Sequence, residues 1–558
     1  MVTLYFIGLG AAASFAIVGA LATGLYAINN HEIALKNYPL TSTDALFAGG
    51  VTDLIGSLGA GTAVWALVYI LATIVLALLI RSERLAFPLR AIVLFFCAIT
   101  FYFGNLAFYY SEPLNENLAV GGSEYNAVDN FNSRGFLYSF IFANNQNADF
   151  RAATIPDDYN PGAAREAISR GDTSGIEQLK DAEKPHIIMV RTGALSEVAL
   201  SPHFNFAGHT DPLENWSRIR GDAISGRIAV PNFNGGTGDT EFDVLTGLNT
   251  RHFVTPYSFR LINSDFDSMA TALNSIGYRS ELLYSGHGWR YNRQNAYQHL
   301  GFDELVFVDD LEGVSAEEDF VSEADAIDYL IQMFEENLES YYETPQFHFG
   351  IADLDREIYL EEDQEVDPED LNFSTLLNLP ENDLAMLTHH FENVAEADLA
   401  LARLHDYVDN LSEPVVLVYF ADQLPPLSMQ VYNLIFPDIH YPESIGGLTR
   451  LNTAPFVIWL NDAAKDLYGI ESAIELVDAN EERFFSASYL GSYLFEILDY
   501  KNVSPFFDFA MDLRQRFPVV MEEISFNTYH YPSNGLSTEE LRPLTLYRNW
   551  SLYRIFDE

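Results

Sequence analysis

Basic residues are scarce in this sequence. Its 558 residues include 30 Lys and Arg against 79 Asp and Glu, which gives a formal net charge of −49. Nucleic-acid binding needs clustered Lys and Arg, so the composition argues against a nucleic-acid partner. The single cysteine, Cys97, excludes an intrachain disulfide. Hydrophobic residues at 48% and aromatic residues at 14% also exclude a disordered acidic tail protein.

The acidic residues are unevenly distributed. Residues 1–112 contain four basic and five acidic side chains, whereas residues 113–558 contain 26 basic and 74 acidic ones. The sequence therefore joins a nearly neutral, apolar part to a strongly acidic part. A solvated acidic surface suited to a saline medium is the simple interpretation of the second part.

Three runs without a charged residue predict an N-terminal bundle of three transmembrane helices, because each run can cross a hydrocarbon core of about 30 Å. The runs lie at about 3–28, 57–80 and 91–111. The short segment after the second run carries Arg81, Arg84 and Arg90, which places it in the cytoplasm by the positive-inside rule. We therefore expect residues 1–112 to be a transmembrane anchor and the acidic part to lie outside the cytoplasm.

The acidic part divides into a connector at 113–180 and a larger domain at 181–558, in which strand and helix signals alternate. Strand signals occur at 186–190, 280–284, 346–351, 414–420 and 456–460. Helix signals occur at 265–277, 324–338 and 394–411. This alternation predicts an α/β domain with a mainly parallel sheet flanked by helices. In such sheets, sites form beyond the carboxyl ends of the strands.

Two candidate residues lie at such places. Thr237 lies in a glycine-rich turn before a helical run at 243–248. Backbone amides and the helix dipole there suit an anionic phosphoryl or sulfuryl group, although a simple helix cap is the alternative. Asp422 follows the strand at 414–420, where a carboxylate can bind a metal ion. A turn-forming role is the alternative for Asp422.

A third segment, at 287–293, is rich in aromatic and basic residues. Arg293 is suited to clamp a phosphate, and Tyr291 is suited to stack on a ligand. A solvated aromatic loop is the alternative interpretation.

Taken in order, these segments resemble the lipoteichoic acid synthase family, which comprises membrane-anchored phosphoglycerol transferases of the alkaline phosphatase/sulfatase superfamily. The resemblance rests on the motifs KPHIIMV at 184–190, GGTGDTEF at 235–242, YNR at 291–293, LGFD at 300–303 and LVYFADQLP at 417–425. It covers roughly residues 131–515. It implies an alkaline phosphatase/sulfatase-like fold for the domain at 181–558.

The resemblance also implies roles for individual residues. Thr237 matches the threonine that takes the phosphoglycerol group as a covalent intermediate and contacts the metal. Asp422 matches a metal-ligand aspartate. Arg293 matches a substrate-binding arginine, Tyr291 replaces a tryptophan beside it, and Arg356 lies where it would meet the transferred anionic group.

Several positions depart from the family pattern. The metal-ligand glutamate falls on Gly193, and the histidine of an Asp-His pair becomes Gln423. Two further active-site histidines fall on Arg356 and Tyr284. Glycine supplies no ligand, and glutamine offers only a neutral oxygen in place of an imidazole. Replacement metal ligands would have to come from Glu197, His209 or His287. The spacing of these residues in the sequence does not favour any of them as a ligand.

Two functions follow from these residues and stay open. The first is a catalytically degenerate protein of the bacterial cytoplasmic membrane, with a periplasmic or extracellular domain that binds or scaffolds in the cell envelope. The alternative is an active transferase that moves phosphoglycerol, or a related phospho-group, from a phospholipid to an envelope glycan through a threonine nucleophile. The active protein would need Mn or Mg, and the degenerate one would need no metal.

Expected partners are membrane lipid, an anionic phospholipid headgroup or an envelope glycan, and membrane proteins, with no nucleic acid. A hydrolase of sulfate or phosphate esters is disfavoured, because sulfatases of this superfamily use a modified Cys or Ser as nucleophile and the matching position here is a threonine.

Overall fold

The computed structural model describes most of the acidic part of the chain and a portion of the apolar part. The described residues are 11–36, scattered positions between 39 and 142, 154–180, 182–193, 195–233, 237–253, 258–262, 264–311, 313–314, 320–352, 371–436, 450–478, 481, 483–521, 524–526 and 536–557. Residues 1–155 and 289–295 form one compact unit, and residues 156–288 and 296–558 form a second.

The first unit contains the long helix α2, Ala11–Lys36. This helix overlaps the first predicted span, 3–28. The predicted span at 57–80, and that at 91–111 apart from three positions, lie outside the described residues. No helix in the described part of the chain combines the length and the apolarity needed to cross a membrane.

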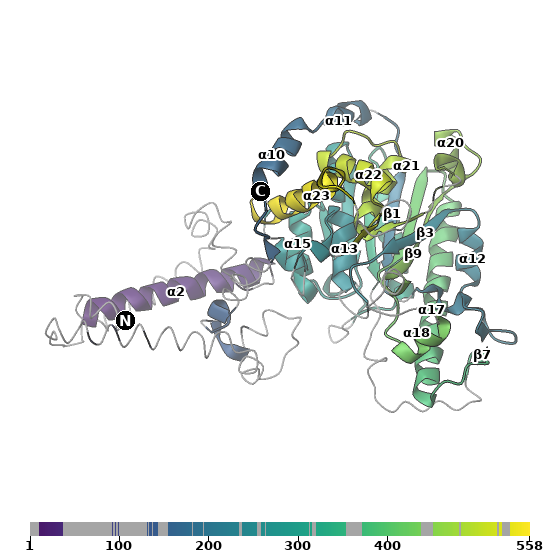
Figure 1. The fold of residues 1–558 in the computed structure, drawn as a ribbon, viewed down its shortest axis with the longest axis horizontal. Helices are drawn as coiled ribbons and strands as arrows, with labels where there is room; N and C mark the ends of the chain where they lie inside the picture. Colours follow the sequence, from purple (N-terminus) through teal and green to yellow (C-terminus); the bar gives the residue numbers. More distant parts are fainter. Residues whose placement is uncertain are drawn as a thin grey trace. The chain divides into compact units, whose positions relative to one another are not determined.

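The second unit is built on a mixed sheet whose eight strands are drawn at the centre of its ribbon (Figure 1). Their spatial order is β10 (Phe484–Ser486), β3 (Ile224–Ala229), β9 (Thr453–Leu460), β8 (Val415–Ala421), β1 (His186–Thr192), β6 (Gln346–Ala352), β4 (Arg279–Tyr284) and β5 (Glu304–Val306). Only β9 runs against the others in this sheet, pairing antiparallel with β3 and β8. The predicted mainly parallel sheet is therefore confirmed.

The central strands are apolar because both of their faces are covered. Every residue of β1, β6 and β8 is buried, as expected for parallel strands between two helical layers. All five predicted strands are present, with ends shifted by at most three residues. The sequence did not predict β3, β5 and β10, because β5 and β10 have three residues each and β3 contains both a glycine and an arginine.

Helices cover both sides of the sheet (Figure 1). One side carries α12 (Glu214–Arg220), α16 (Glu323–Ser340) and α17 (Glu381–Asp409). The other carries α13 (Thr237–Thr246), α14 (Met269–Ser275), α21 (Leu490–Ile497), α22 (Pro505–Arg516) and α23 (Thr538–Phe556). The predicted helix at 394–411 was too short, because α17 begins 13 residues earlier.

Shorter elements complete the described chain. The remaining α-helices are α10 (Pro161–Arg170), α11 (Ser174–Leu179), α15 (Arg293–His299), α18 (Met429–Ile435) and α20 (Asp462–Tyr468). Two strand pairs lie outside the main sheet, β2 (Phe204–Asn205) with β7 (Ser374–Thr375) and β11 (Val519–Met521) with β12 (Ile524–Phe526). Helix α10, from the predicted connector, packs on α23.

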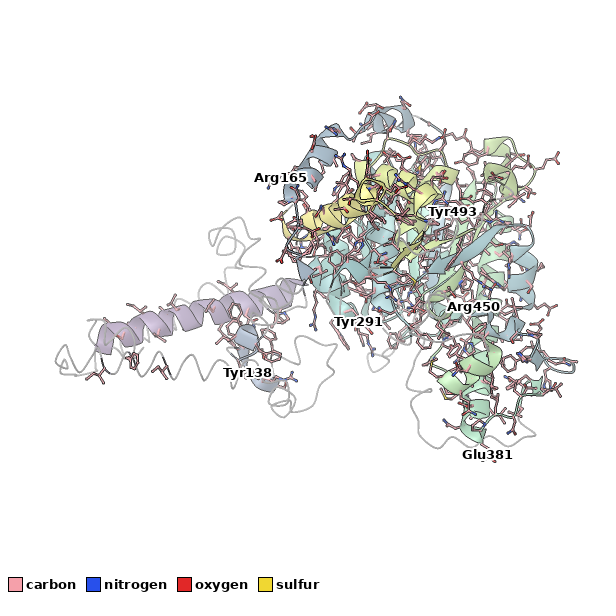
Figure 2. All side chains as sticks on the ribbon, viewed as in Figure 1. Tyr138, Arg165, Tyr291, Glu381, Arg450 and Tyr493 are labelled. Atoms are coloured by element: carbon pink, nitrogen blue, oxygen red, sulfur yellow. The ribbon has the colours of Figure 1, made fainter. Side chains whose placement is uncertain are left out.

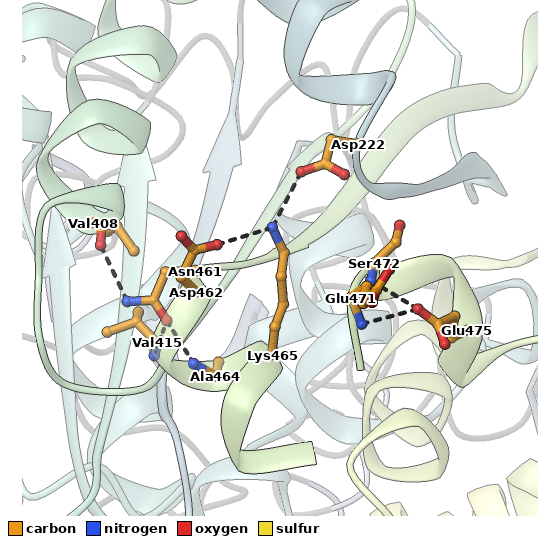
Figure 3. Close-up of polar contacts among 10 residues, drawn as sticks. All are labelled: Asp222, Val408, Val415, Asn461, Asp462, Ala464, Lys465, Glu471, Ser472 and Glu475. Carbon is orange, nitrogen blue, oxygen red and sulfur yellow. Dashed lines mark hydrogen bonds and ion pairs between the residues drawn. The ribbon is translucent and has the colours of Figure 1, made fainter. Parts of the chain in front are cut away.

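The buried side chain of Asn461 joins three elements at the amino end of β8 (Figure 3). Its Oδ1 accepts hydrogen bonds from the backbone N–H of Val415, which begins β8, and of Ala464 in the first turn of α20, both at 3.0 Å. Its Nδ2 donates to the carbonyls of Val408 in α17 and Glu413. One amide side chain thereby provides hydrogen-bond partners for backbone N–H and C=O groups at strand and helix ends, which would otherwise be buried without partners.

Candidate functional site

The helix that carries the predicted nucleophile packs against the carboxyl end of β8. Thr237 is the first residue of α13, whereas the sequence predicted a helix only from 243. One turn later, the hydroxyl of Thr240 donates a hydrogen bond of 2.8 Å to the backbone carbonyl of Asp422. The start of α13 and Asp422 therefore lie together, as the predicted site requires. The side chain of Thr237 lies outside what the structure describes.

Two buried carboxylates lie on the same helix. Burial raises the pKa of Asp239, which accepts hydrogen bonds from the Asn232 side chain at 2.6 Å and from the Ser258 backbone at 3.2 Å. Burial raises the pKa of Asp243 strongly, although the Thr250 backbone donates to it at 2.8 Å. These bonds attach the helix to the segments before and after it, so we interpret both groups as structural rather than catalytic.

The centre of the site is a buried arginine that the sequence prediction missed. Arg191, the penultimate residue of β1, has 0% of its side chain exposed. Its Nη2 donates to Oε2 of Glu241 on α13 at 3.3 Å, and its Nη1 lies 3.9 Å from Oδ2 of Asp422. Nη1 also donates to the carbonyl of Ala352 at the end of β6 at 3.3 Å. Thus Asp422, predicted to face a metal ion, faces a guanidinium group.

A signal for this arginine was present in the sequence. Arg191 follows an apolar run and extends a strand that is buried on both faces. A charged side chain at such a position needs a charged partner, because an unpaired buried charge is very costly. The strand prediction ended two residues too early, at 190, and so left Arg191 unexamined.

A divalent cation does not fit the described part of this site. A cation on Asp422 would lie a few ångströms from the Arg191 guanidinium, where repulsion amounts to about 4 kcal/mol per unit charge at an effective dielectric of about 20. Gln423 directs its amide nitrogen toward Oδ2 of Asp422 at 3.3 Å, and Gly193 supplies only its backbone, which donates to Ala352. Among the described residues, no three His, Cys, Asp or Glu side chains come together as a metal site.

A second acidic group lies near this centre. Glu323, the first residue of α16, is buried and accepts a hydrogen bond from the Tyr419 hydroxyl on β8. Burial raises the pKa of Glu323 to about 7, while hydrogen bonds from Thr192 and Tyr419 and the charge of Arg191 oppose the shift. Its carboxyl is therefore partly protonated at neutral pH.

Replacing Glu323 with glutamine is expected to change the pH dependence of stability. Between pH 4.5 and 7 the unfolded chain releases a proton that native Glu323 retains, so the wild type loses stability as pH rises through this window. The loss is about 3 kcal/mol. Glu323→Gln should therefore gain about 3 kcal/mol over the wild type between pH 4.5 and 8 in urea unfolding.

The matched control is Glu339→Gln, which makes the same substitution at an exposed position of α16. The control should follow the wild type at every pH. A constant difference between Glu323→Gln and the wild type across this range would contradict the assignment of the shift to Glu323.

The predicted substrate-binding residues Tyr291 and Arg293 belong to the first compact unit, so their contacts are given separately from those of the second unit. The Arg293 guanidinium lies 5.0 Å from the ring centroid of Tyr291, which Figure 2 labels. Tyr291 and Asn292 have φ angles of 56° and 66°. Successive left-handed residues other than glycine cost energy and are concentrated at functional loops. Arg356 lies outside the described residues.

The other positions singled out in the sequence have structural partners. Tyr284 is buried, and its ring packs edge-on against Phe307 and Phe320. His287 has its Nδ1 2.9 Å from Asp309. The two carboxylate oxygens of Glu197 each bind an arginine, and His209 is exposed. None of these groups joins Asp422 in the part of the chain that the structure describes.

The described sheet and its flanking helices define an α/β protein with an alkaline phosphatase/sulfatase-like fold. The structure of the Streptococcus pyogenes phosphoglycerol transferase GacH in complex with sn-glycerol-1-phosphate matches with a TM-score of 0.50 and 16% identity, over 71% of this chain and 94% of that one. The lipoteichoic acid synthase LtaP from Listeria monocytogenes matches with a TM-score of 0.44 and 14% identity, over 69% and 97% of the two chains.

The family model described as Sulfatase matches residues 199–500, which is more than half of the chain. The chain therefore belongs to the sulfatase family, and the resemblance predicted from its motifs is confirmed. A Rhizobium meliloti protein described as "Putative cyclic beta-1,2-glucan modification protein" is 22% identical over 516 residues, covering 87% of this chain and 76% of that protein.

Proposed function

We propose that this protein is a membrane-anchored sulfatase-family protein whose extracytoplasmic domain binds anionic components of the bacterial envelope without transferring a phospho-group. The observation that carries the proposal is the position of Arg191, 3.9 Å from Asp422 and 3.3 Å from Glu241. Its permanent charge neutralises the carboxylates where the family resemblance implies a metal ion. Without the metal, a threonine hydroxyl lacks the cation that lowers its pKa and holds phosphate oxygens.

The proposed location and partners rest on the sequence and on the relatives. The three apolar runs and the arginines between the second and third support an anchor at residues 1–112 in the cytoplasmic membrane, with the acidic domain periplasmic or extracellular. The printed descriptions of the relatives name a cyclic glucan, lipoteichoic acid and a glycerol phosphate. They support a membrane lipid, a phospholipid headgroup or an envelope glycan as partner, alongside membrane proteins.

The second candidate is an active phosphoglycerol transferase. It is favoured by the hydrogen bond from Thr240 to Asp422, which brings the first turn of α13 to the end of β8. In this case Thr237 would be the nucleophile and Asp422 would bind Mn or Mg. The substrate would then be held by Arg293, Tyr291 and Arg356.

A transfer assay separates the two functions. The full chain in detergent micelles is incubated with phosphatidylglycerol, a glucan acceptor and either Mn or Mg. Transfer of phosphoglycerol from the lipid to the acceptor would release one diacylglycerol for each new phosphodiester. We expect the wild type and Thr237→Ala to release the same background amount of diacylglycerol.

Metal binding provides the second readout of this prediction. Because Arg191 neutralises Asp422, we expect calorimetric titration with Mn or Mg to give the same result for the wild type and Asp422→Asn. Release of diacylglycerol that needs metal, and that both Thr237→Ala and Asp422→Asn abolish, would instead establish the transferase.

A further inference from the structure

A cavity of about 680 Å³ lies beside the carboxyl end of β8. Its wall includes Leu424, two residues beyond Asp422, together with the middle of β3, the beginning of β9, the segment after β1 and the end of α18. The volume lies within the range of about 300–1,000 Å³ that is typical of small-molecule sites.

The charge of this cavity is opposite to that of the protein. Four arginines line it, and the described residues of its wall include a single carboxylate, that of Glu197. The arginines are Arg220, Arg227, Arg450 and Arg483. The chain as a whole carries 79 acidic and 30 basic residues, so its general composition does not account for this cluster. A concave site lined by one sign of charge attracts ligands of the opposite sign.

The single carboxylate is already engaged. Oε1 of Glu197 lies 2.7 Å from Nη1 of Arg220, and Oε2 lies 3.0 Å from Nη2 of Arg227. One negative charge is thus shared between two guanidinium groups, which it holds side by side. Among the described lining residues this leaves an excess of positive charge, and none of them offers a further counter-charge to a cationic ligand group.

The other two arginines add directed donors. Arg483 donates from Nε to the backbone carbonyl of Ser225 at 2.8 Å, which fixes its guanidinium against β3. Its Nη1 is shielded from solvent and has no hydrogen-bond partner among the described residues. The Arg450 guanidinium, labelled in Figure 2, lies 5.9 Å from the ring centroid of Phe436 at the end of α18. A shielded donor without a partner is unfavourable.

We propose that this cavity binds a phosphate or sulfate ester of a small polyol or sugar. Guanidinium groups recognise the oxygens of such anions through paired, charge-assisted hydrogen bonds. Apolar side chains of Leu424, Ile435 and Phe436 form part of the wall and can contact the carbon skeleton. Because Glu197 is occupied, the cavity discriminates against a zwitterionic headgroup. This inference rests on the proposed binding of anionic envelope components and names the ligand class and its site. It holds whether or not the protein transfers a phospho-group.

The test is equilibrium binding of radiolabelled sn-glycerol-1-phosphate to the full chain in detergent micelles. We expect saturable binding that inorganic phosphate competes away, that glycerol does not affect, and that weakens as NaCl is raised. Arg450→Gln and Arg220→Gln should each weaken binding about 10-fold, as expected for loss of a hydrogen bond to a charged group.

Arg218→Gln is the matched control, because Arg218 lies on the same helix as Arg220, is also exposed, and pairs with Asp406 at 3.7 Å outside the cavity. It should bind like the wild type. Absence of saturable binding, insensitivity to Arg450→Gln, or an equal loss in Arg218→Gln would overturn the proposal. Circular dichroism checks that each variant is folded.

Two competition experiments identify whether the ester comes from a lipid headgroup or from a glycan. Vesicles of phosphatidylglycerol and a soluble phosphorylated oligosaccharide are each compared as competitors of the radiolabelled compound. Competition by the vesicles alone assigns the ester to a lipid headgroup, and competition by the oligosaccharide alone assigns it to a glycan. Either result supports the anion site, whereas Thr237-dependent transfer would contradict only the proposed function.

Discussion

Replacing Arg191 with methionine is expected to lower the free energy of unfolding by about 3–5 kcal/mol, the usual cost of removing one member of a buried ion pair. Methionine fills a similar length of the buried space, but it leaves the carboxylates of Glu241 and Asp422 without their cation. The measurement is urea unfolding of the full chain, followed by circular dichroism.

The loss should arise from the two buried carboxylates, Glu241 and Asp422, that this substitution leaves without the Arg191 charge. Adding Glu241→Gln and Asp422→Asn to this variant should recover part of the loss, because neutral side chains need no counter-charge.

The control for this experiment is Arg218→Met, the same substitution at an exposed arginine of α12. Exposed ion pairs contribute at most about 1 kcal/mol, so this variant should unfold close to the wild type. If Arg191→Met does not fold, Arg191→Lys preserves the charge and should be destabilised less. A change below about 1 kcal/mol in Arg191→Met would contradict the ion-pair assignment.

Replacing His348 with phenylalanine is expected to stabilise the protein in acid. His348 is buried on β6, and neither of its ring nitrogens has a hydrogen-bond partner among the described residues. Burial lowers its pKa to about 3, and the positive charges of His186 and Arg279 contribute to the shift. Phenylalanine has a similar shape and can keep the edge-on contact with Phe334, whose ring centroid lies 5.2 Å away.

The sign follows from proton linkage. Below the ordinary histidine pKa of 6.5 the unfolded chain binds a proton that native His348 rejects, so the wild type loses stability as pH falls from 6.5 toward 3. The variant should therefore gain about 2 kcal/mol over the wild type between pH 7.5 and pH 5, and about 5 kcal/mol by pH 3.

His209→Phe makes the same substitution at an exposed histidine and serves as the control. Its stability relative to the wild type should be the same at pH 7.5 and pH 5. A similar gain in both variants, or no gain in His348→Phe, would show that the acid sensitivity arises elsewhere in the chain.

Much of the fold could be predicted from local patterns. The apolar runs at 186–190 and 414–420 marked central strands, because a strand covered on both faces needs apolar residues throughout. Asp422 directly follows the second of these strands, as its position in the sequence predicted. Element ends were less accurate, and the missing residues at the end of β1 concealed Arg191.

The site could not be predicted to the same depth. Arg191, Glu241 and Asp422 are far apart in the sequence and meet only because α13 packs against β1 and β8. The arginine-lined cavity also depends on residues that are far apart in the sequence. The antiparallel insertion of β9 beside β3 brings Arg450, just before β9, toward Arg227 on β3.

The sequence by itself determined the α/β class, the sulfatase-family motif order and the separation of an apolar part from an acidic one, because periodicity and composition are local properties. Through the family resemblance it also predicted that metal ligands are missing at Gly193 and Gln423. Only the tertiary structure decided which charge faces Asp422 and where the few arginines gather. A buried charge is stabilised by the groups that lie beside it in the folded structure, and these groups can be far away along the chain.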